Sequence, residues 1–340
     1  MSASILVLGL FVFLILPLAA GIWVLSCIVR ETRRDRVPIL LYHRLVARSD
    51  VARGAVPDDE MIWVSYDDVF GRQMDYLARA GFTTLDLDDY LAIREGGREL
   101  PQKPVIVTFD DGYESNYTLA YPALRRNGQK AVIFVAPEPD AYTRNLVAGI
   151  DGFLTDEQMR EMSDHGVSIQ SHSLTHALLT DLADPEIERE LVLSRERLAG
   201  VTGRPVLHLA IPRGGYSRTI RRIARETGYR TVCCNNKGSA SGFSDLLALP
   251  RIVIERDMDE AQFARSLTPA SGVMLRVIGN LKRVPERIGG PRFARRVRGH
   301  LYRSPLRGMF KTASLRRVVS VGGLLYVVLA AGFWIRFAGL

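Results

Sequence analysis

The stretch Val105-Ile106-Val107-Thr108-Phe109-Asp110-Asp111-Gly112-Tyr113 decides the fold class of this 340-residue chain. Apolar and β-branched residues run into two adjacent carboxylates, and a glycine follows at once. The pattern predicts a buried strand that ends at Asp110-Asp111 and turns at Gly112. Neighbouring side chains at a strand end point in different directions, so one carboxylate can face a metal while the other faces a water. Taken alone, the stretch fits a surface turn or a helix cap equally well.

Outward from this strand, short apolar segments alternate with segments of helical spacing. Further strands are predicted at 37–44, 131–135, 167–170, 206–211, 229–234 and 249–254. Residues 47–65 are polar and are expected to form an exposed loop. The alternation predicts a parallel sheet that is covered by helices and closed into a barrel. In such folds the chemistry gathers at the carboxyl ends of the strands.

Two histidines four residues apart, His172 and His176, follow one of these strands. Together with one carboxylate they make a three-ligand site with an open position, which is the catalytic form of a divalent-metal site. A metal lowers the pKa of its bound water, and a second acid can take the proton. The histidine pair alone is weak evidence for a metal site. It becomes strong evidence together with Asp110-Asp111 in a chain that alternates strands and helices.

Three motifs in this chain resemble those of the polysaccharide deacetylase family, also called the NodB-homology or carbohydrate esterase family 4 domain. They are Thr108–Tyr113, Ser171–His176, and Pro212 with its glycines. The resemblance covers about residues 37–260. It is closest to the subgroup that deacetylates poly-N-acetylglucosamine, which carries an early Tyr-His such as Tyr42-His43. The resemblance implies a distorted (β/α)7 barrel.

The resemblance also implies roles for the matching residues. Asp111, His172 and His176 would bind the divalent metal, usually Zn²⁺. Asp110 would be the general base for attack of the metal-bound water on an acetamide carbonyl. His43 would be the acid that protonates the leaving amine, with a packed core histidine as the alternative.

The third motif departs from the family pattern. The backbone N–H of Arg213, after Pro212, would hold the oxyanion, and Tyr216 follows shortly as a substrate-binding candidate. Many members carry an arginine that pairs with the base where this chain has Ala210. Arg213 is therefore expected either to replace that arginine or to bind substrate.

The other histidines and the cysteines are given structural roles. The adjacent cysteines are expected to pack in a strand, since no disulfide framework is suggested. The histidines are expected to be ordinary helix-end, strand and surface residues. These residues are His165, His208, His300, Cys233 and Cys234.

Both ends of the chain are apolar. Residues 5–29 are uncharged and long enough to cross a bilayer, so a transmembrane anchor is expected, with a cleaved signal peptide as the alternative. Residues 318–335 are expected to form a second transmembrane helix, or else a re-entrant or interfacial one. The basic segment 276–317 contains thirteen Lys/Arg and a single acid, Glu286. This segment therefore carries a net charge of +12, whereas the whole chain carries +8.

Charge placement suggests an orientation and partners. Lysines and arginines flank the inner ends of both apolar runs, which favours a catalytic domain in the cytoplasm and an integral inner-membrane protein. Translocation of the long domain to the periplasm or exterior is the alternative. The basic segment is expected to contact anionic lipid headgroups rather than nucleic acid, because no recognition motif accompanies the charge.

The sequence therefore predicts a hydrolase of carbon–nitrogen bonds in non-peptide amides. The substrate would be an amino sugar in a polysaccharide or lipid-linked glycan, and other polysaccharide biosynthesis proteins are candidate partners. One alternative is a catalytically inactive glycan-binding or scaffolding subunit of a synthesis complex. Another is a metal-dependent hydrolase of non-sugar amides on the same fold.

Overall fold

A computed structural model of the chain describes residues 15–54, 56–57, 60–141, 143–144, 149 and 151–280. The chain divides into two compact units. The larger unit, Arg33–Thr268, carries every residue that the sequence assigns to the site. The smaller unit comprises Met1–Thr32 and Pro269–Leu340.

The larger unit alternates strands and helices along most of its length. Its strands are β1 Ile39–Tyr42, β2 Arg44–Val46, β3 Val64–Tyr66, β4 Thr83–Leu85, β5 Pro104–Phe109, β6 Ala131–Val135, β7 Val167–Ser171, β8 His208–Ala210, β9 Thr231–Lys237 and β10 Leu249–Val253. Its α-helices are α3 Arg48–Ala52, α4 Asp67–Arg79, α5 Leu87–Arg94, α6 Tyr121–Arg126, α8 Asp156–Asp164, α9 Asp184–Thr202, α10 Arg218–Glu226 and α11 Glu260–Ser266. Short turns of other helix types are η2 Glu60–Trp63, η3 Asn116–Ala120, η4 Leu179–Asp181, η5 Pro212–Gly214 and η6 Leu246–Ala248.

Seven parallel strands close into a ring in the order β1-β10-β9-β8-β7-β6-β5, and β5 pairs back with β1. The first half of β5 also pairs with β4, whereas its second half pairs with β6. Because β5 changes neighbours along its length, β4 adds an eighth strand outside the ring. The predicted seven-stranded parallel barrel is confirmed, and β4 is a strand that the sequence did not predict.

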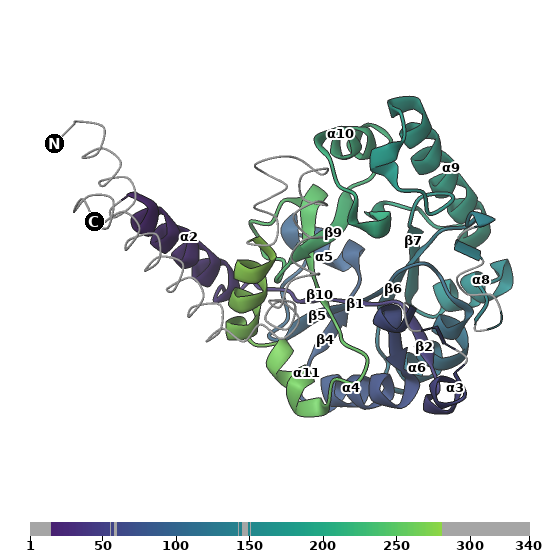
Figure 1. Cartoon of the computed structure of the whole chain (residues 1–340), viewed down its shortest axis with the longest axis horizontal. Helices are drawn as coiled ribbons and strands as arrows, with labels where there is room; N and C mark the ends of the chain where they lie inside the picture. Colours follow the sequence, from purple (N-terminus) through teal and green to yellow (C-terminus); the bar gives the residue numbers. More distant parts are fainter. Residues whose placement is uncertain are drawn as a thin grey trace, which may run out of the picture. The chain divides into compact units, whose positions relative to one another are not determined.

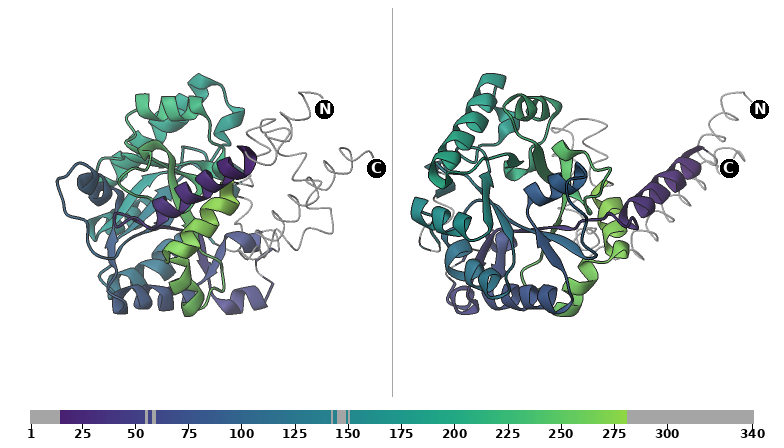
Figure 2. Two further views of the ribbon diagram at one scale, coloured as in Figure 1. Left: turned by 90° about the vertical axis from the view of Figure 1, so that its left-hand side faces the viewer. Right: turned by 180° about the vertical axis from the view of Figure 1, so that it is seen from behind.

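Helices surround the strands of the larger unit on the outside (Figure 1). The view from behind shows the same arrangement, with α9 next to α10 (Figure 2). All six residues of β5 and all five of β6 are buried, as their continuous apolar sequence predicts. Helix starts follow the sequence as well. Thr155 and Gln158 form a capping box that begins α8.

The expectation of an exposed polar loop at 47–65 is wrong in part, because the stretch is structured and some of its residues are buried. This stretch contains α3 and η2, and β3 at its end pairs in parallel with β2 in a separate two-stranded sheet. Glu60 and Val64 are buried. The carboxylate of Glu60 accepts a hydrogen bond from the fully buried Arg44 at 2.8 Å. A composition rich in polar residues concealed this fold, because one of its charged residues, Glu60, is paired inside the protein.

In the smaller unit, α2 spans Leu16–Glu31 and residues 269–280 are helical. Arg276, the first residue of the predicted basic segment, pairs through 2.6 and 2.9 Å hydrogen bonds with the buried Glu31. Among residues 15–280 as described, no helix combines the length and apolarity needed to cross a bilayer. Residues 5–14, 281–317 and the predicted helix at 318–335 lie outside the described residues.

Candidate active site

Strand ends bring four of the predicted site residues together. Asp110 and Asp111 follow β5 directly, and His172 follows β7. The Nε2 atoms of His172 and His176 lie 3.3 and 3.2 Å from the same Oδ1 of Asp111. One ligand atom from each of these three residues falls within 4.8 Å of the others. The predicted cluster is therefore formed in the fold.

The tautomer of His172 fits a metal ligand. Its Nδ1 lies 2.9 Å from the carbonyl oxygen of Ala210, which can only accept, so Nδ1 carries the hydrogen. In the neutral ring, Nε2 then presents a lone pair toward the carboxylate of Asp111. Two acceptors at 3.3 Å repel each other unless a cation or an added proton lies between them. A divalent cation bound by one carboxylate and two imidazoles satisfies these atoms, so the residues present fit the ion.

Asp110 is held by an arginine that the sequence analysis did not identify. Both terminal nitrogens of Arg251 donate to the carboxylate of Asp110, at 2.6 and 2.7 Å. Both side chains are buried. Burial alone would raise the pKa of Asp110, but the guanidinium of Arg251 holds that pKa below its usual value. Arg251, rather than Arg213, is the partner of Asp110.

The backbone is strained where the cluster forms. In the described part of the chain, the non-glycine residues with positive φ are Asp111, Ser173, His176 and Arg213, at 77°, 61°, 65° and 53°. All four belong to the three motifs. Each such residue costs on the order of 1–3 kcal/mol and persists only where the surroundings fix it. Burial alone would raise the pKa of Asp111, but the neighbouring histidines His172 and His176 hold that pKa well below its usual value.

Glu190 on α9 fixes the loop between the two histidines. Its Oε2 accepts the backbone N–H groups of Leu174 and Thr175 at 2.9 Å, and its Oε1 accepts the hydroxyl of Thr175 at 2.8 Å. On the other side, Nδ1 of His176 lies 3.3 Å from the hydroxyl of Thr143. The orientation of His176 therefore depends on two segments that are remote in sequence.

His43 lies beside the cluster, between β1 and β2. The register of β1 with β5 pairs Tyr42 with Phe109, and the N–H of Asp110 donates to the carbonyl of Tyr42 at 3.0 Å. The side-chain amide of Asn116 donates to the carbonyl of His43 at 2.8 Å. Burial lowers the pKa of His43, and the nearby charges of Asp111 and Asp110 only partly offset that effect. His43 is thus placed on the same rim as the two acids.

The third motif forms η5, directly after β8. Pro212 is buried and Arg213 is exposed. The backbone N–H of Gly215 donates to the carbonyl of Pro212 at 3.3 Å within this turn. The hydroxyl of Tyr216 donates to the carbonyl of Leu247 at 2.7 Å. The carbonyl of Ala210 that orients His172 ties the start of this turn to the cluster.

The residues assigned structural roles have them where they are described. His208 is buried in β8 and contacts Thr231 and Asp88 at 2.9 and 3.1 Å. His165 follows the end of α8. Cys233 and Cys234 are free and buried in β9. His300 lies outside the described residues.

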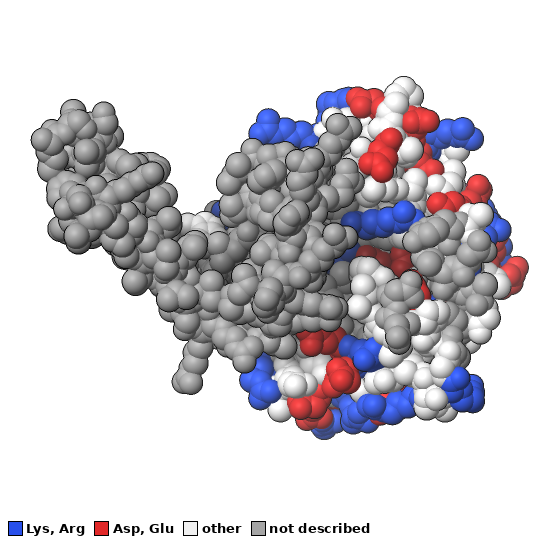
Figure 3. All heavy atoms as spheres, in the orientation of Figure 1, with Lys and Arg blue, Asp and Glu red and all other residues white. Residues whose placement is uncertain are grey.

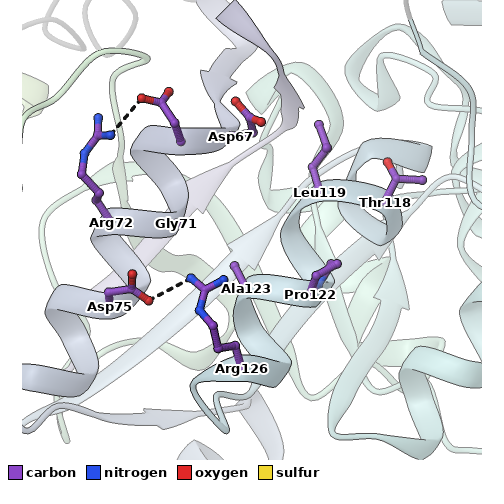
Figure 4. Close-up of a pocket in the computed structure, with 10 residues that line it drawn as sticks. Asp67, Gly71, Arg72, Asp75, Thr118, Leu119, Pro122, Ala123 and Arg126 are labelled. Atoms are coloured by element: carbon purple, nitrogen blue, oxygen red, sulfur yellow. Dashed lines mark hydrogen bonds and ion pairs between the residues drawn. The ribbon is translucent and has the colours of Figure 1, made fainter.

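A separate surface hollow of about 360 Å³ lies between α4 and the η3–α6 segment (Figure 4). Its charges are compensated by ion pairs of Arg72 with Asp68 and of Arg126 with Asp75. On the face shown in Figure 3, acidic and basic side chains are interspersed over the described surface. Neither the hollow nor that face offers a concentration of one charge.

Sequence reasoning missed Arg251, Glu190 and Thr143. Arg251 did leave a signal, because a lone arginine within the apolar run Leu249–Ile254 needs an anionic partner inside the protein. Glu190 lies on a long helix among several other acids, and Thr143 lies in an irregular segment. Nothing in the sequence distinguishes these two residues from their neighbours.

Comparisons with known proteins agree with this geometry. The family described as "Polysaccharide deacetylase" matches residues 97–232. The "Putative polysaccharide deacetylase YxkH" of Bacillus subtilis (strain 168) is 28% identical over 238 residues, covering 70% of this chain and 78% of that protein. The Streptococcus pyogenes deacetylase PplD, solved with acetate, is 25% identical with a TM-score of 0.61, covering 70% of this chain and 100% of that one.

A shorter match is to a protein named as a poly-N-acetylglucosamine deacetylase, the subgroup whose motifs this chain resembles. The poly-beta-1,6-N-acetyl-D-glucosamine N-deacetylase of Escherichia coli (strain K12) is 38% identical over 53 residues, which is 16% of this chain and 8% of that protein. The family match, the similar barrel and the clustered Asp and His residues agree. Residues 97–232 of this chain match the polysaccharide deacetylase family, whose members are hydrolases of N-acetyl amide bonds, and the relatives similar to the rest of the larger unit are deacetylases as well.

Proposed function

We propose that this chain is a metal-dependent N-deacetylase that removes the acetyl group from an amino sugar in a glycan. The observation that carries the proposal is the pairing of a three-ligand cluster with an adjacent carboxylate that is held ionised. Asp111, His172 and His176 supply the cluster. Asp110 supplies the carboxylate, and Arg251 holds it.

Asp111, His172 and His176 would hold one divalent ion, with zinc as the ion best matched to one carboxylate and two imidazoles. When bound, such an ion supplies a Lewis acid that lowers the pKa of a water and polarises a carbonyl. The hydrogen bond between His172 and Ala210 fixes the imidazole in the orientation that a ligand needs.

Asp110 accepts a proton from the attacking water as the water oxygen bonds to the acetyl carbon. His43 then donates a proton to the sugar nitrogen as the carbon–nitrogen bond breaks, so that acetate and a free amine result. The backbone N–H of Arg213 is assigned to the carbonyl oxygen of the acetamide, where negative charge develops. Tyr216 is assigned to substrate binding beside it.

Acetate release from an N-acetylglucosamine oligomer tests the activity, and metal analysis tests the ligands. Asp110→Asn should abolish turnover and keep the metal, whereas His176→Ala should lose both. Equal metal loss in the two variants would overturn the division of roles between base and ligands. A wild-type protein that stays empty under saturating zinc would leave a glycan-binding or scaffolding subunit as the better reading. Acetate release from small amides alone would point to a hydrolase of non-sugar amides.

The membrane location belongs to the same proposal. The described part of α2 exposes large apolar side chains, with Leu18 and Ile22 each 61% exposed. Such side chains are suited to lipid. We assign the chain to the inner membrane, with the catalytic unit in the cytoplasm and anionic headgroups near the basic segment. A topology reporter inserted at 52–54 tests the side, and a periplasmic signal would favour an exported polymer over a lipid-linked sugar as substrate.

A further inference from the structure

One exposed aromatic side chain lies against the proposed acid. Trp63, the last residue of η2, has its ring centroid 4.8 Å from that of His43, with the rings inclined by 54°. The residue is 43% exposed, and its neighbour Ile62 is 71% exposed. It is the sole tryptophan between residues 33 and 268. The indole therefore contacts the site on one side and leaves much of its surface in solvent.

The position of Trp63 is fixed by two contacts in the chain around it. Arg44 pairs with Val64 in the β2–β3 register, which brings the preceding residues, His43 and Trp63, next to each other. At the start of η2, the carboxylate of Glu60 accepts a hydrogen bond from Arg44, and both side chains are buried. An exposed apolar ring held this firmly beside polar groups is suited to contact a ligand rather than to fill a core.

We propose that Trp63 forms a stacking surface for a pyranose ring of the substrate, next to the sugar whose acetyl group is removed. This inference rests on the proposed deacetylase function and specifies its substrate class as a glycan of at least two sugars. A sugar ring has an apolar face of C–H groups and polar edges. The aromatic face of the indole can pack against the apolar face of the sugar, while polar groups on the neighbouring rim can bind the polar edges of the sugar.

His43 connects this surface to the cluster. The N–H of Asp110 donates to the carbonyl of Tyr42, the residue before His43, so the indole, the imidazole and the two acids follow one another along the rim. A glycan stacked on Trp63 therefore passes close to His43. The stacking surface would thus help to place the sugar nitrogen at the proposed proton donor.

The first test measures binding without turnover. In an Asp110→Asn background, adding Trp63→Ala should weaken binding of chitopentaose about tenfold, and Trp63→Phe should recover most of the loss. Phe243→Ala is the matched control. Phe243 is 78% exposed and lies against Arg33, which precedes β1, at the opposite end of that strand from His43. An unchanged dissociation constant in Trp63→Ala would overturn the inference.

The second test reads the indole directly and does not depend on the alanine variant folding. With Trp23→Phe and Trp334→Phe, Trp63 is the remaining tryptophan. Chitopentaose should shift its fluorescence to shorter wavelength and saturate, whereas maltopentaose should give a much smaller change. A shift with anionic vesicles and none with chitopentaose would assign the surface to lipid and overturn the inference.

Kinetics separate this inference from the function on which it rests. If the wild type releases acetate from chitopentaose, Trp63→Ala should raise KM for that substrate about tenfold and leave hydrolysis of a small aryl acetate unchanged. Unchanged KM with an active wild type would refute the stacking surface alone. An inactive wild type that still gives the fluorescence shift would refute the proposed function alone.

Discussion

Arg251 and Asp110 form a buried ion pair joined by two hydrogen bonds, at 2.6 and 2.7 Å, between β10 and the end of β5. The pair links strands that are remote in sequence but lie on either side of β1 in the ring. It holds Asp110 ionised next to the proposed metal ligand Asp111. The planar guanidinium also fixes the carboxylate plane, which a point charge could not do.

Removing Arg251 should reduce both stability and activity. Arg251→Met leaves a buried carboxylate unpaired, so the free energy of unfolding should fall by about 3–5 kcal/mol. The rate of acetate release should fall by roughly 10²-fold because the base is no longer oriented or held ionised. Urea unfolding and kinetics measure the two effects, with the exposed Arg204→Met as control. A variant with wild-type stability would contradict the structural role of the pair.

Replacing Arg251 should also change the pH dependence of activity. The folded-state pKa of Asp110 is lowered, so its charge stabilises the fold above the unfolded-state pKa, and that contribution is lost as pH falls through the folded-state pKa. Without Arg251, the folded-state pKa should rise. The acid limb of kcat/KM should then move to higher pH in Arg251→Lys, which keeps a charge but loses the two-pronged contact. An acid limb at the wild-type pH would show that Arg251 does not set this pKa.

The ring and the metal cluster could be predicted because their signals are local. Continuous apolar strands indicate a buried parallel sheet, and Asp111, His172 and His176 each directly follow a strand or share a motif. The exposed loop expected at 47–65 shows where this reasoning stops. Its polar composition suggested solvent, yet Glu60 is buried because Arg44 pairs with it across 16 positions.

The partner of Asp110 could not be derived for a similar reason. Arg251 is 141 positions away, and only the closure of the barrel brings the two together. Trp63 was hidden likewise, because its contact with His43 follows from the β2–β3 register, which no local pattern encodes. The sequence predicts the apolar pattern of the strands, but it does not predict which side chains remote in sequence will contact each other.

Glu190 should control metal affinity without touching the metal. Its carboxylate accepts three hydrogen bonds from Leu174 and Thr175, which lie between the two histidines. In Glu190→Ala the loop loses these bonds, and zinc affinity should fall about 10- to 100-fold. Competition with a fluorescent chelator measures this, and Glu196→Ala, exposed on the same helix, should bind zinc normally. Wild-type affinity in Glu190→Ala would show that the loop holds its shape without the carboxylate.

Gly112 should be intolerant of a side chain for two separable reasons. Its φ is +78°, and an added Cβ would lie 2.8 Å from Cγ1 of Val135. Gly112→Ala should therefore lower the free energy of unfolding by roughly 2–4 kcal/mol, through backbone strain and overpacking. Combining it with Val135→Ala relieves the contact but not the strain. Urea unfolding of all four proteins should show favourable coupling, and strictly additive losses would exclude the contact as a cause.

The role of His43 can be tested by changing the leaving group. An amine leaves only after it is protonated, whereas a nitrophenolate leaves readily without a proton. His43→Gln should therefore slow acetate release from chitopentaose by roughly 10²- to 10⁴-fold and leave the hydrolysis of nitrophenyl acetate nearly unchanged. Bound zinc, measured in the same preparation, should equal that of the wild type, since His43 is not among the three residues of the cluster. Equal losses on both substrates with full zinc occupancy would remove His43 as the acid, because a proton donor to the leaving group has no part in releasing a nitrophenolate.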